Sequence, residues 1–127
     1  MRKRIYIALC LLCFSAWLRA QNSIDEVVDN FSTVGSSTYT SAIERDPQTR
    51  KVVRVVKTLE TRGQVVSDLI RAFQKERETG TFSRKEENEE VTMILATENE
   101  GGNRVYMLQY SGRGYHRGKA TIIIKPK

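Results

Sequence analysis

The stretch from Gln64 to Glu78 constrains the fold most, because its apolar residues recur with the period of an α-helix. These residues share one stripe of the helix surface, and polar residues occupy the rest. The stripe consists of Val65, Val66, Leu69, Ile70 and Phe73. Thr61 with Gln64 matches a capping box, and Gly80 stands where a helix ends. A lone amphipathic helix of this length is marginally stable in water, so it needs an apolar surface to pack against.

Residues 1–20 have the three parts of a secretory signal peptide. Met1 to Arg4 is basic, Ile5 to Leu18 is an uncharged apolar run, and Ala20 is a small residue at the expected cleavage position. The run is shorter than the roughly 20 residues that span a bilayer. We therefore expect cleavage after Ala20, no transmembrane segment in the mature chain, and a secreted or periplasmic location.

Two cysteines, Cys10 and Cys13, lie within the apolar run. A lipid-modified cysteine would follow small residues, whereas Leu9 and Leu12 precede these two. Cleavage after Ala20 removes both cysteines, so the mature chain would contain no disulfide, no thiolate metal site and no cysteine nucleophile.

The strong positive charge of the chain also comes largely from the signal segment. The sequence has 21 Lys and Arg and 15 Asp and Glu. Four of the basic residues precede residue 21, which leaves 17 against 15, or a net charge of about +2. Nucleic-acid binding needs a strong basic surface, so we expect no nucleic-acid partner. Residues 21–127 are long enough to form one domain with its own core.

The remaining segments alternate between helix and strand signals. A first helix is expected over 23–34, with a capping box at Ser23 and Glu26. The pattern of residues 36–60 predicts a β-hairpin around the turn at Asp46 and Pro47. Three further strands, connected by glycine-containing turns at 99–103 and 112–118, are indicated by alternating side chains. These strands fall within residues 91–96, 105–110 and 120–124.

The order α-β-β-α-β-β-β predicts an α+β domain. We expect a single antiparallel sheet of four to five strands, with two helices packed on one face. The charged run 84–90 is expected to be a solvated loop after a short strand at 81–83. Its glutamates could in principle bind calcium, but their spacing is not that of a calcium loop. The face without helices is expected to carry a half-polar set that includes Arg54, Thr92, Tyr106 and Tyr110.

The chain resembles a family of short secreted proteins of unknown function from Bacteroidota. Three features carry the resemblance: the signal peptide ending in Ala20 and Gln21, the hairpin Tyr39 to Leu59 built around the turn Glu44 to Thr49, and the helix segment Leu69 to Phe73. The resemblance implies a secreted domain associated with the cell envelope. It implies no catalytic residues.

The glycine-rich turn at 112–118 is the sharpest candidate site. Its three glycines allow backbone N–H groups to converge on an anion. Basic side chains and hydrogen-bond donors surround these glycines. They are Arg113, Tyr115, His116, Arg117 and Lys119. The alternative is a hairpin loop that needs glycine for its turn angles and arginine for solubility. A second candidate surface consists of Tyr39, Tyr106, Tyr110 and Tyr115, because exposed tyrosines suit protein or glycan contacts. The alternative is that Tyr106 and Tyr110 serve cross-strand pairing within the sheet.

These features favour a non-catalytic binding module that captures a protein, peptide or glycan of the envelope or the extracellular space. The alternative is a structural protein that self-associates through an edge strand. A small enzyme is a further alternative, with His116 as acid or base and Arg113 or Arg117 holding an anionic substrate. We expect no metal and no cofactor, because the mature chain has one histidine and no cysteine.

Overall fold

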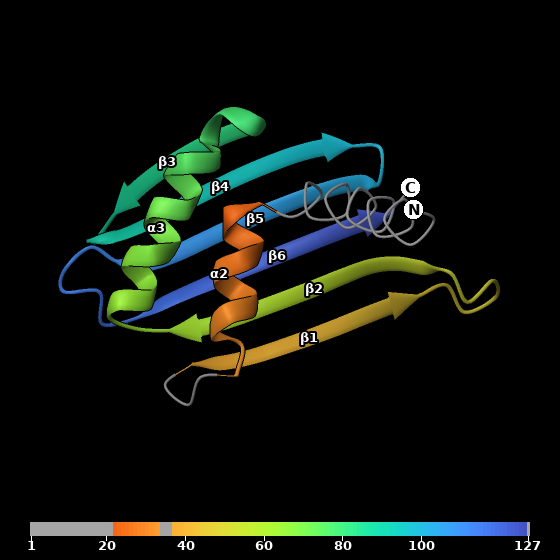
Figure 1. Ribbon diagram of the computed structural model, residues 1–127, viewed down its shortest axis with the longest axis horizontal. Helices are drawn as coiled ribbons and strands as arrows, with labels where there is room; N and C mark the ends of the chain where they lie inside the picture. Colours follow the sequence, from red (N-terminus) through yellow and green to blue (C-terminus); the bar gives the residue numbers. More distant parts are fainter. Residues whose placement is uncertain (1–21, 34–36, 127) are drawn as a thin grey trace, which may run out of the picture.

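The computed structural model describes residues 22–33 and 37–126; the predicted signal peptide lies outside them. The described chain forms two α-helices, one short 3-10 helix and six strands (Figure 1). In chain order these are α2 (Ser23–Phe31), β1 (Thr38–Arg45), β2 (Val52–Thr61), α3 (Gln64–Glu76), η1 (Arg77–Thr79), β3 (Thr81–Glu87), β4 (Glu90–Asn99), β5 (Gly102–Ser111) and β6 (Gly118–Pro126).

All six strands form one antiparallel sheet in the order β1-β2-β6-β5-β4-β3. Both helices cover the same face of this sheet, and among the described residues no helix lies on the opposite face (Figure 1). The α+β class, the single antiparallel sheet and the position of the helices are therefore confirmed. The expectation of four to five strands is wrong, because the sheet has six.

The sixth strand is β3. It starts where a short strand was expected at 81–83, and it continues through Glu87 into the charged run that was expected to be a loop. β3 is an edge strand, where charged side chains on both faces can stay in water. It returns into β4 through a two-residue turn, with Glu87 paired to Glu90. Asn88 and Glu89 in this turn both have positive φ, 53° and 67°, as a type I′ turn requires. No glycine marks this turn, so the sequence pattern gave little indication of it.

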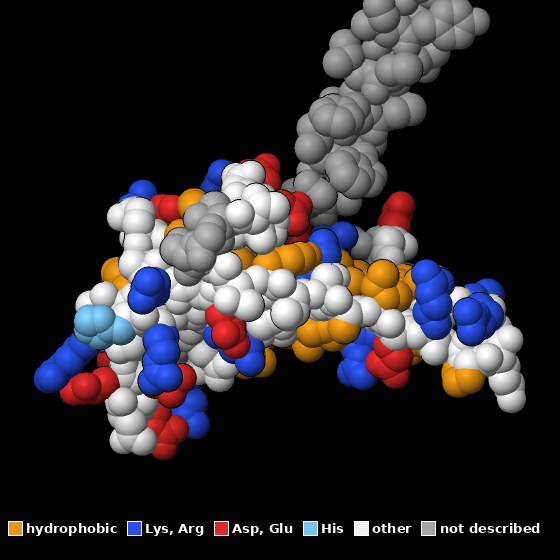
Figure 2. All heavy atoms as spheres, turned by 90° about the horizontal axis from the view of Figure 1, so that it is seen from below, with side chains coloured by type: hydrophobic (Ala, Val, Ile, Leu, Met, Phe, Trp, Pro, Cys, Tyr) orange, Lys and Arg blue, Asp and Glu red, His pale blue; other side chains and the backbone are white. Residues whose placement is uncertain are grey.

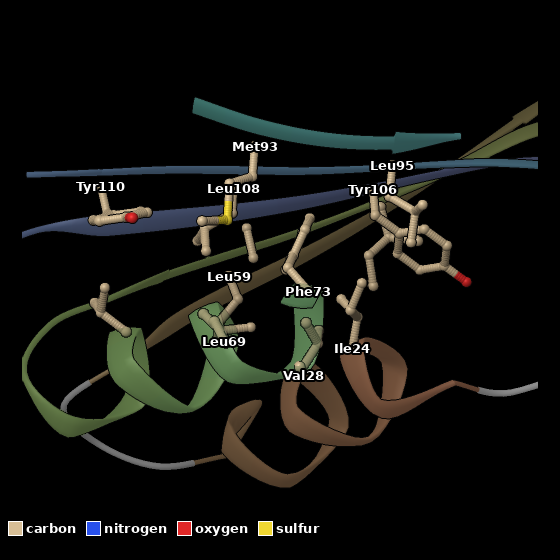
Figure 3. Close-up of a cluster of buried hydrophobic side chains, with 14 of the residues drawn as sticks. Ile24, Val28, Leu59, Leu69, Phe73, Met93, Leu95, Tyr106, Leu108 and Tyr110 are labelled. Atoms are coloured by element: carbon tan, nitrogen blue, oxygen red, sulfur yellow. The ribbon is translucent and has the colours of Figure 1, made fainter. Parts of the chain in front are cut away.

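The core lies between the helices and the covered face of the sheet (Figure 3). The stripe predicted for α3 is confirmed, since Val66, Leu69 and Phe73 are fully buried. α2 adds Ile24 and Val28 beside them. Every other residue of the four inner strands completes this layer. The fully buried members from the strands are Leu59, Val91, Met93, Leu95, Tyr106, Leu108, Ala120 and Ile122.

Tyr106 and Tyr110 point towards the helices, not towards the open face (Figure 3). Tyr106 is 1% exposed and Tyr110 is 7% exposed. The expectation that they form an exposed tyrosine surface is therefore wrong. Both alternating sets in β5 are largely apolar, and the aromatic set buries more surface. Arg54 and Thr92 do lie on the open face, because they alternate with residues of the covered one.

The starts of both helices differ from the capping boxes that the sequence suggested. α3 begins after Gly63, whose φ is 70°, with no side-chain cap, and Thr61 instead bonds Ser37 through its hydroxyl group at 2.8 Å. The cap of α2 lies one residue earlier than expected. Asn22 accepts a hydrogen bond from the Asp25 N–H, and Asp25 accepts one from the Asn22 N–H, both at 3.0 Å.

Asp25 also connects α2 to the sheet. Its Oδ2 atom accepts hydrogen bonds from the Tyr106 hydroxyl at 3.0 Å and the Arg104 guanidinium at 3.1 Å. The Asp25 side chain is 4% exposed, and the Arg104 side chain is 20% exposed. At the same end of α2, Glu76 of α3 accepts hydrogen bonds from the Ser23 N–H and hydroxyl groups. The start of α2 is thus bonded to both β5 and α3.

Replacing Asp25 should destabilise the protein more than replacing any exposed acid. Asp25→Ala removes the side-chain half of the capping box and leaves a largely buried guanidinium and a buried hydroxyl without their acceptor, at a cost of about 2–4 kcal/mol. Urea unfolding measures the change in free energy. Asp29→Ala, on the exposed side of the same helix, is the matched control. An equal effect of the two substitutions would contradict a structural role for this carboxylate.

Stability should also fall in alkaline solution through Tyr106. Burial, together with the nearby Asp25 carboxylate, raises the pKa of Tyr106 from 10.0 to about 12. The folded state therefore holds this proton more tightly than the unfolded state, so the stabilisation is complete below pH 10 and is lost as the pH rises from 10 to 12. Urea unfolding at several pH values should show that the Tyr106→Phe variant loses less free energy of unfolding than the wild type between pH 10 and 12. If the free energies of unfolding of the two proteins fall in parallel with pH, the loss of stability does not come from Tyr106.

Candidate functional site

The turn between β5 and β6 is bonded to its surroundings at three points. The Ser111 N–H donates to the Arg117 carbonyl at 3.1 Å and closes the turn itself. The Gly112 N–H donates to the Glu89 carbonyl at 2.7 Å, which joins this turn to the β3–β4 turn. The Gly63 N–H donates to the Tyr115 carbonyl at 2.9 Å, which joins it to the start of α3. The turn is therefore a fixed part of the fold.

The glycines of this turn serve its geometry. Gly114 has a φ of 67° and is followed by Tyr115 at 50°. Gly118 lies against α3, and a Cβ atom at this position would come 2.5 Å from Cγ2 of Val66. The Gly112 and Ser111 N–H groups already donate to carbonyl groups. These two N–H groups are thus not available for the anion-binding arrangement that the glycine spacing suggested.

The structure separates the predicted site residues into three groups. Arg113 points outwards and forms an ion pair with Glu89 at 3.2 Å. Tyr115 contacts Tyr110 edge to face, with ring centroids 5.9 Å apart, and His116 is exposed at this end of the molecule (Figure 2). Arg117 lines a groove on the open side of the sheet. Tyr106 belongs to none of these groups, because it is in the core.

The environment of Tyr110 explains why it contributes little surface. Its ring lies under Tyr115, and burial raises the pKa of its hydroxyl group, although the positive charge of Arg84 opposes this effect.

The groove has a volume of about 520 Å³ and lies where two hairpin turns meet the ends of the central strands. Its walls come from β2, the β3–β4 turn, the end of β5 and the start of β6. The residues that line it are Glu60, Thr61, Asn88, Glu89, Glu90, Gln109, Tyr110, Ser111, Arg117, Gly118 and Lys119. None of these side chains is aliphatic.

Charges of both signs face this groove. Its acidic residues are Glu60, Glu89 and Glu90, and its basic residues are Arg117 and Lys119. Within residues 22–33 and 37–126, Glu89 is the one member of these five that forms an ion pair, and its partner is Arg113 outside the groove. The other four residues are exposed to solvent.

Sequence reasoning found Arg117 and Lys119 but missed the acidic wall. Glu60 is paired directly opposite Lys119 because β2 and β6 are neighbours in the sheet. Glu90 is paired with Ser111 in the same way. The strand order was needed to bring these residues together. The charged run before β4 was the available signal, but it was interpreted as a solvated loop.

A second hollow of about 460 Å³ lies on the other side of the turn. It is lined by Arg62, Gly63, Gly114, Tyr115 and His116. This hollow is more open than the groove and contains the histidine that was considered as an acid or base. The described part of the chain places no carboxylate in its lining.

The described residues offer no candidate metal site and no candidate membrane-spanning helix. These residues contain no group of three or more His, Cys, Asp and Glu side chains arranged to hold a metal ion. No helix among them has the length and the apolar character needed to cross a membrane.

The fold and groove define a two-layer α+β domain with two helices on one face of a six-stranded antiparallel sheet. Residues 21–114 match the family described as "Domain of unknown function (DUF5024)", which covers most of the chain. The protein therefore belongs to the DUF5024 family. No curated protein and no solved structure gives a significant match.

The contact between Gly118 and α3 can be tested by substitution. Gly118→Ala should destabilise the protein by about 1–3 kcal/mol, because the new methyl group overlaps the Val66 side chain. Val66→Ala removes the overlapping atoms, so the double variant should lose less stability than the sum of the single variants. Urea unfolding of the three variants measures this coupling. Additive losses would show that residue 118 does not contact Val66.

Proposed function

We propose that this protein is a non-catalytic binding module of the periplasm or the extracellular space, and that its groove binds a peptide segment carrying charges of both signs. One observation carries the proposal: the groove directs Glu60 and Glu90 together with Arg117 and Lys119 at solvent. Charged groups of a ligand would form charge-assisted hydrogen bonds with these four side chains.

The rigidity of the groove supports this function. The bond between Gly112 and Glu89 holds its two turns together, and the Tyr115 carbonyl ties one of them to α3. Asn88, Glu89 and Tyr115 all have positive φ in these two turns. A wall that is fixed before binding lowers the entropic cost of holding a ligand.

The chemistry of the lining favours a peptide over a glycan. Sugar recognition commonly uses exposed aromatic faces, and the one aromatic residue of the groove, Tyr110, is 7% exposed. Paired acidic and basic groups instead match the side chains and backbone of a polar peptide. The groove is formed at strand ends, where backbone groups can also take part in binding.

The proposed location rests on the signal peptide expected from the sequence. Residues 1–20 combine a basic start, an uncharged apolar run and a small residue at the cleavage position. A periplasmic or extracellular module would meet polypeptide segments of envelope proteins in that compartment.

Binding can be tested with an array of mixed-charge peptides and, in parallel, a glycan array. The purified protein should select peptides with neighbouring acidic and basic residues. Lys119→Ala should weaken the selected peptides by at least about tenfold, because it removes one charged contact. Lys119→Glu should shift the selection from acidic to basic residues at one position. Titration calorimetry measures the affinities.

Lys125→Ala is the matched control, because Lys125 lies on the same strand and the same face but near the opposite end of the sheet. It should leave the affinity unchanged. Equal losses at Lys119 and Lys125 would indicate non-specific charge attraction and contradict the groove. Capture of glycans alone would overturn the choice of a peptide.

A further inference from the structure

The sheet has an unprotected edge at β1. β1 pairs with β2 on one side, and among the described residues no strand lies on its other side (Figure 1). Its first six residues, Thr38 to Ile43, carry no charge and include no proline. Ile43 is 57% exposed, although it is a large apolar residue. Such an edge offers unpaired backbone groups to another strand.

The opposite edge of the same sheet shows the contrast. β3 carries four charged residues in succession, Arg84 to Glu87. They form ion pairs along the strand, Arg84 with Glu86 at 3.4 Å and Lys85 with Glu87 at 3.2 Å. Charged side chains are a common means of preventing edge-to-edge pairing. β3 has this protection, and the first six residues of β1 do not.

The charges of β1 itself lie outside its central part, and the nearest charge to that part is Lys57 of β2, which is paired with Ser41 on the inner side. Glu44 and Arg45 stand at its end, and Glu44 is paired within the chain to Arg54 of β2. Figure 2 looks onto this edge of the molecule, where white and orange surface lies among charged side chains of both signs. The central part of β1 therefore presents no charge of its own to the strand of a second copy.

The sequence of β1 is complementary to itself in an antiparallel arrangement centred on Ser41. Tyr39 of one copy then lies opposite Ile43 of the other, on the face that carries the helices. Aromatic residues opposite β-branched residues are favourable cross-strand pairs. Thr40 lies opposite Ala42, and Thr38 opposite Glu44, so no like charges meet. This register also covers the exposed Ile43 side chain.

From these observations we infer that two copies of the protein associate through β1, antiparallel and centred on Ser41, to form one continuous sheet. The dimer does not depend on the proposed function, because the groove lies at the strand ends and not along this edge. An eight-residue strand buries a small area, which places the contact among weak interfaces. Association should therefore depend on concentration in the micromolar to millimolar range.

Sedimentation equilibrium over this range should show the mass of the full chain doubling. Ile43→Lys should raise the dissociation constant at least about tenfold, because it places a charge on the edge. Val53→Lys is the matched control: Val53 is 48% exposed in the adjacent strand and falls at the irregularity of the β1–β2 pairing. A monomer up to millimolar concentration would overturn the inference, as would equal effects of the two substitutions.

Cross-linking tests the register. Ser41→Cys places two thiols on directly opposed residues, whose Cα atoms are about 4.5–5.5 Å apart and within disulfide range. Thr38→Cys is the control on the same edge, since its two copies would be about 20 Å apart. The wild-type chain, with Cys10 and Cys13, gives the background under the same oxidant. Equal cross-linking of the Thr38 variant or of Ser83→Cys on β3 would overturn this register.

Discussion

One carboxylate oxygen, Oδ2 of Asp25, links the first helix to the rest of the protein. It accepts hydrogen bonds from the Asn22 N–H, the Arg104 guanidinium and the Tyr106 hydroxyl. α2 has nine residues, too few for a helix to be stable alone in water. Its stability therefore depends on contacts with the sheet and α3. Without Asp25, Ile24 and Val28 would lose the anchor that holds them against the core.

The periodicity of the sequence predicted the elements well and their faces less well. The α3 stripe and the hairpins were predictable because apolar and polar residues clearly separate along them. In β5 both alternating sets are apolar, with Val105 and Met107 on one face and Tyr106 and Leu108 on the other. Alternation therefore could not decide which set was buried. Packing against Phe73 and Ile24 decides it, and that contact is not visible in a sequence.

The groove was predictable only on its basic side. Arg117 and Lys119 follow glycines in a turn, which is a local signal. Glu60 is 59 residues away from Lys119 in the chain and meets it only because β2 and β6 pair. Short connections suggested antiparallel neighbours, but the pairing of β2 with the last strand closes over a long range. A site assembled across such a pair needs the strand order.

The groove and the β1 edge have a defined relation in the proposed dimer. A two-fold axis through Ser41, perpendicular to the sheet, keeps the open faces of both copies on the same side. The axis also reverses the direction of the strands in the second copy. The dimer has a sheet of twelve strands, six from each copy, and each groove lies at the Glu60 end of its own β2. The two grooves therefore lie at opposite ends of this sheet. Two grooves on one face can bind two segments of the same partner. The second contact is then intramolecular, and this raises the overall affinity without any new contact within either groove. Weak pairing through β1 and weak binding in each groove would therefore reinforce each other on a partner that carries repeated segments.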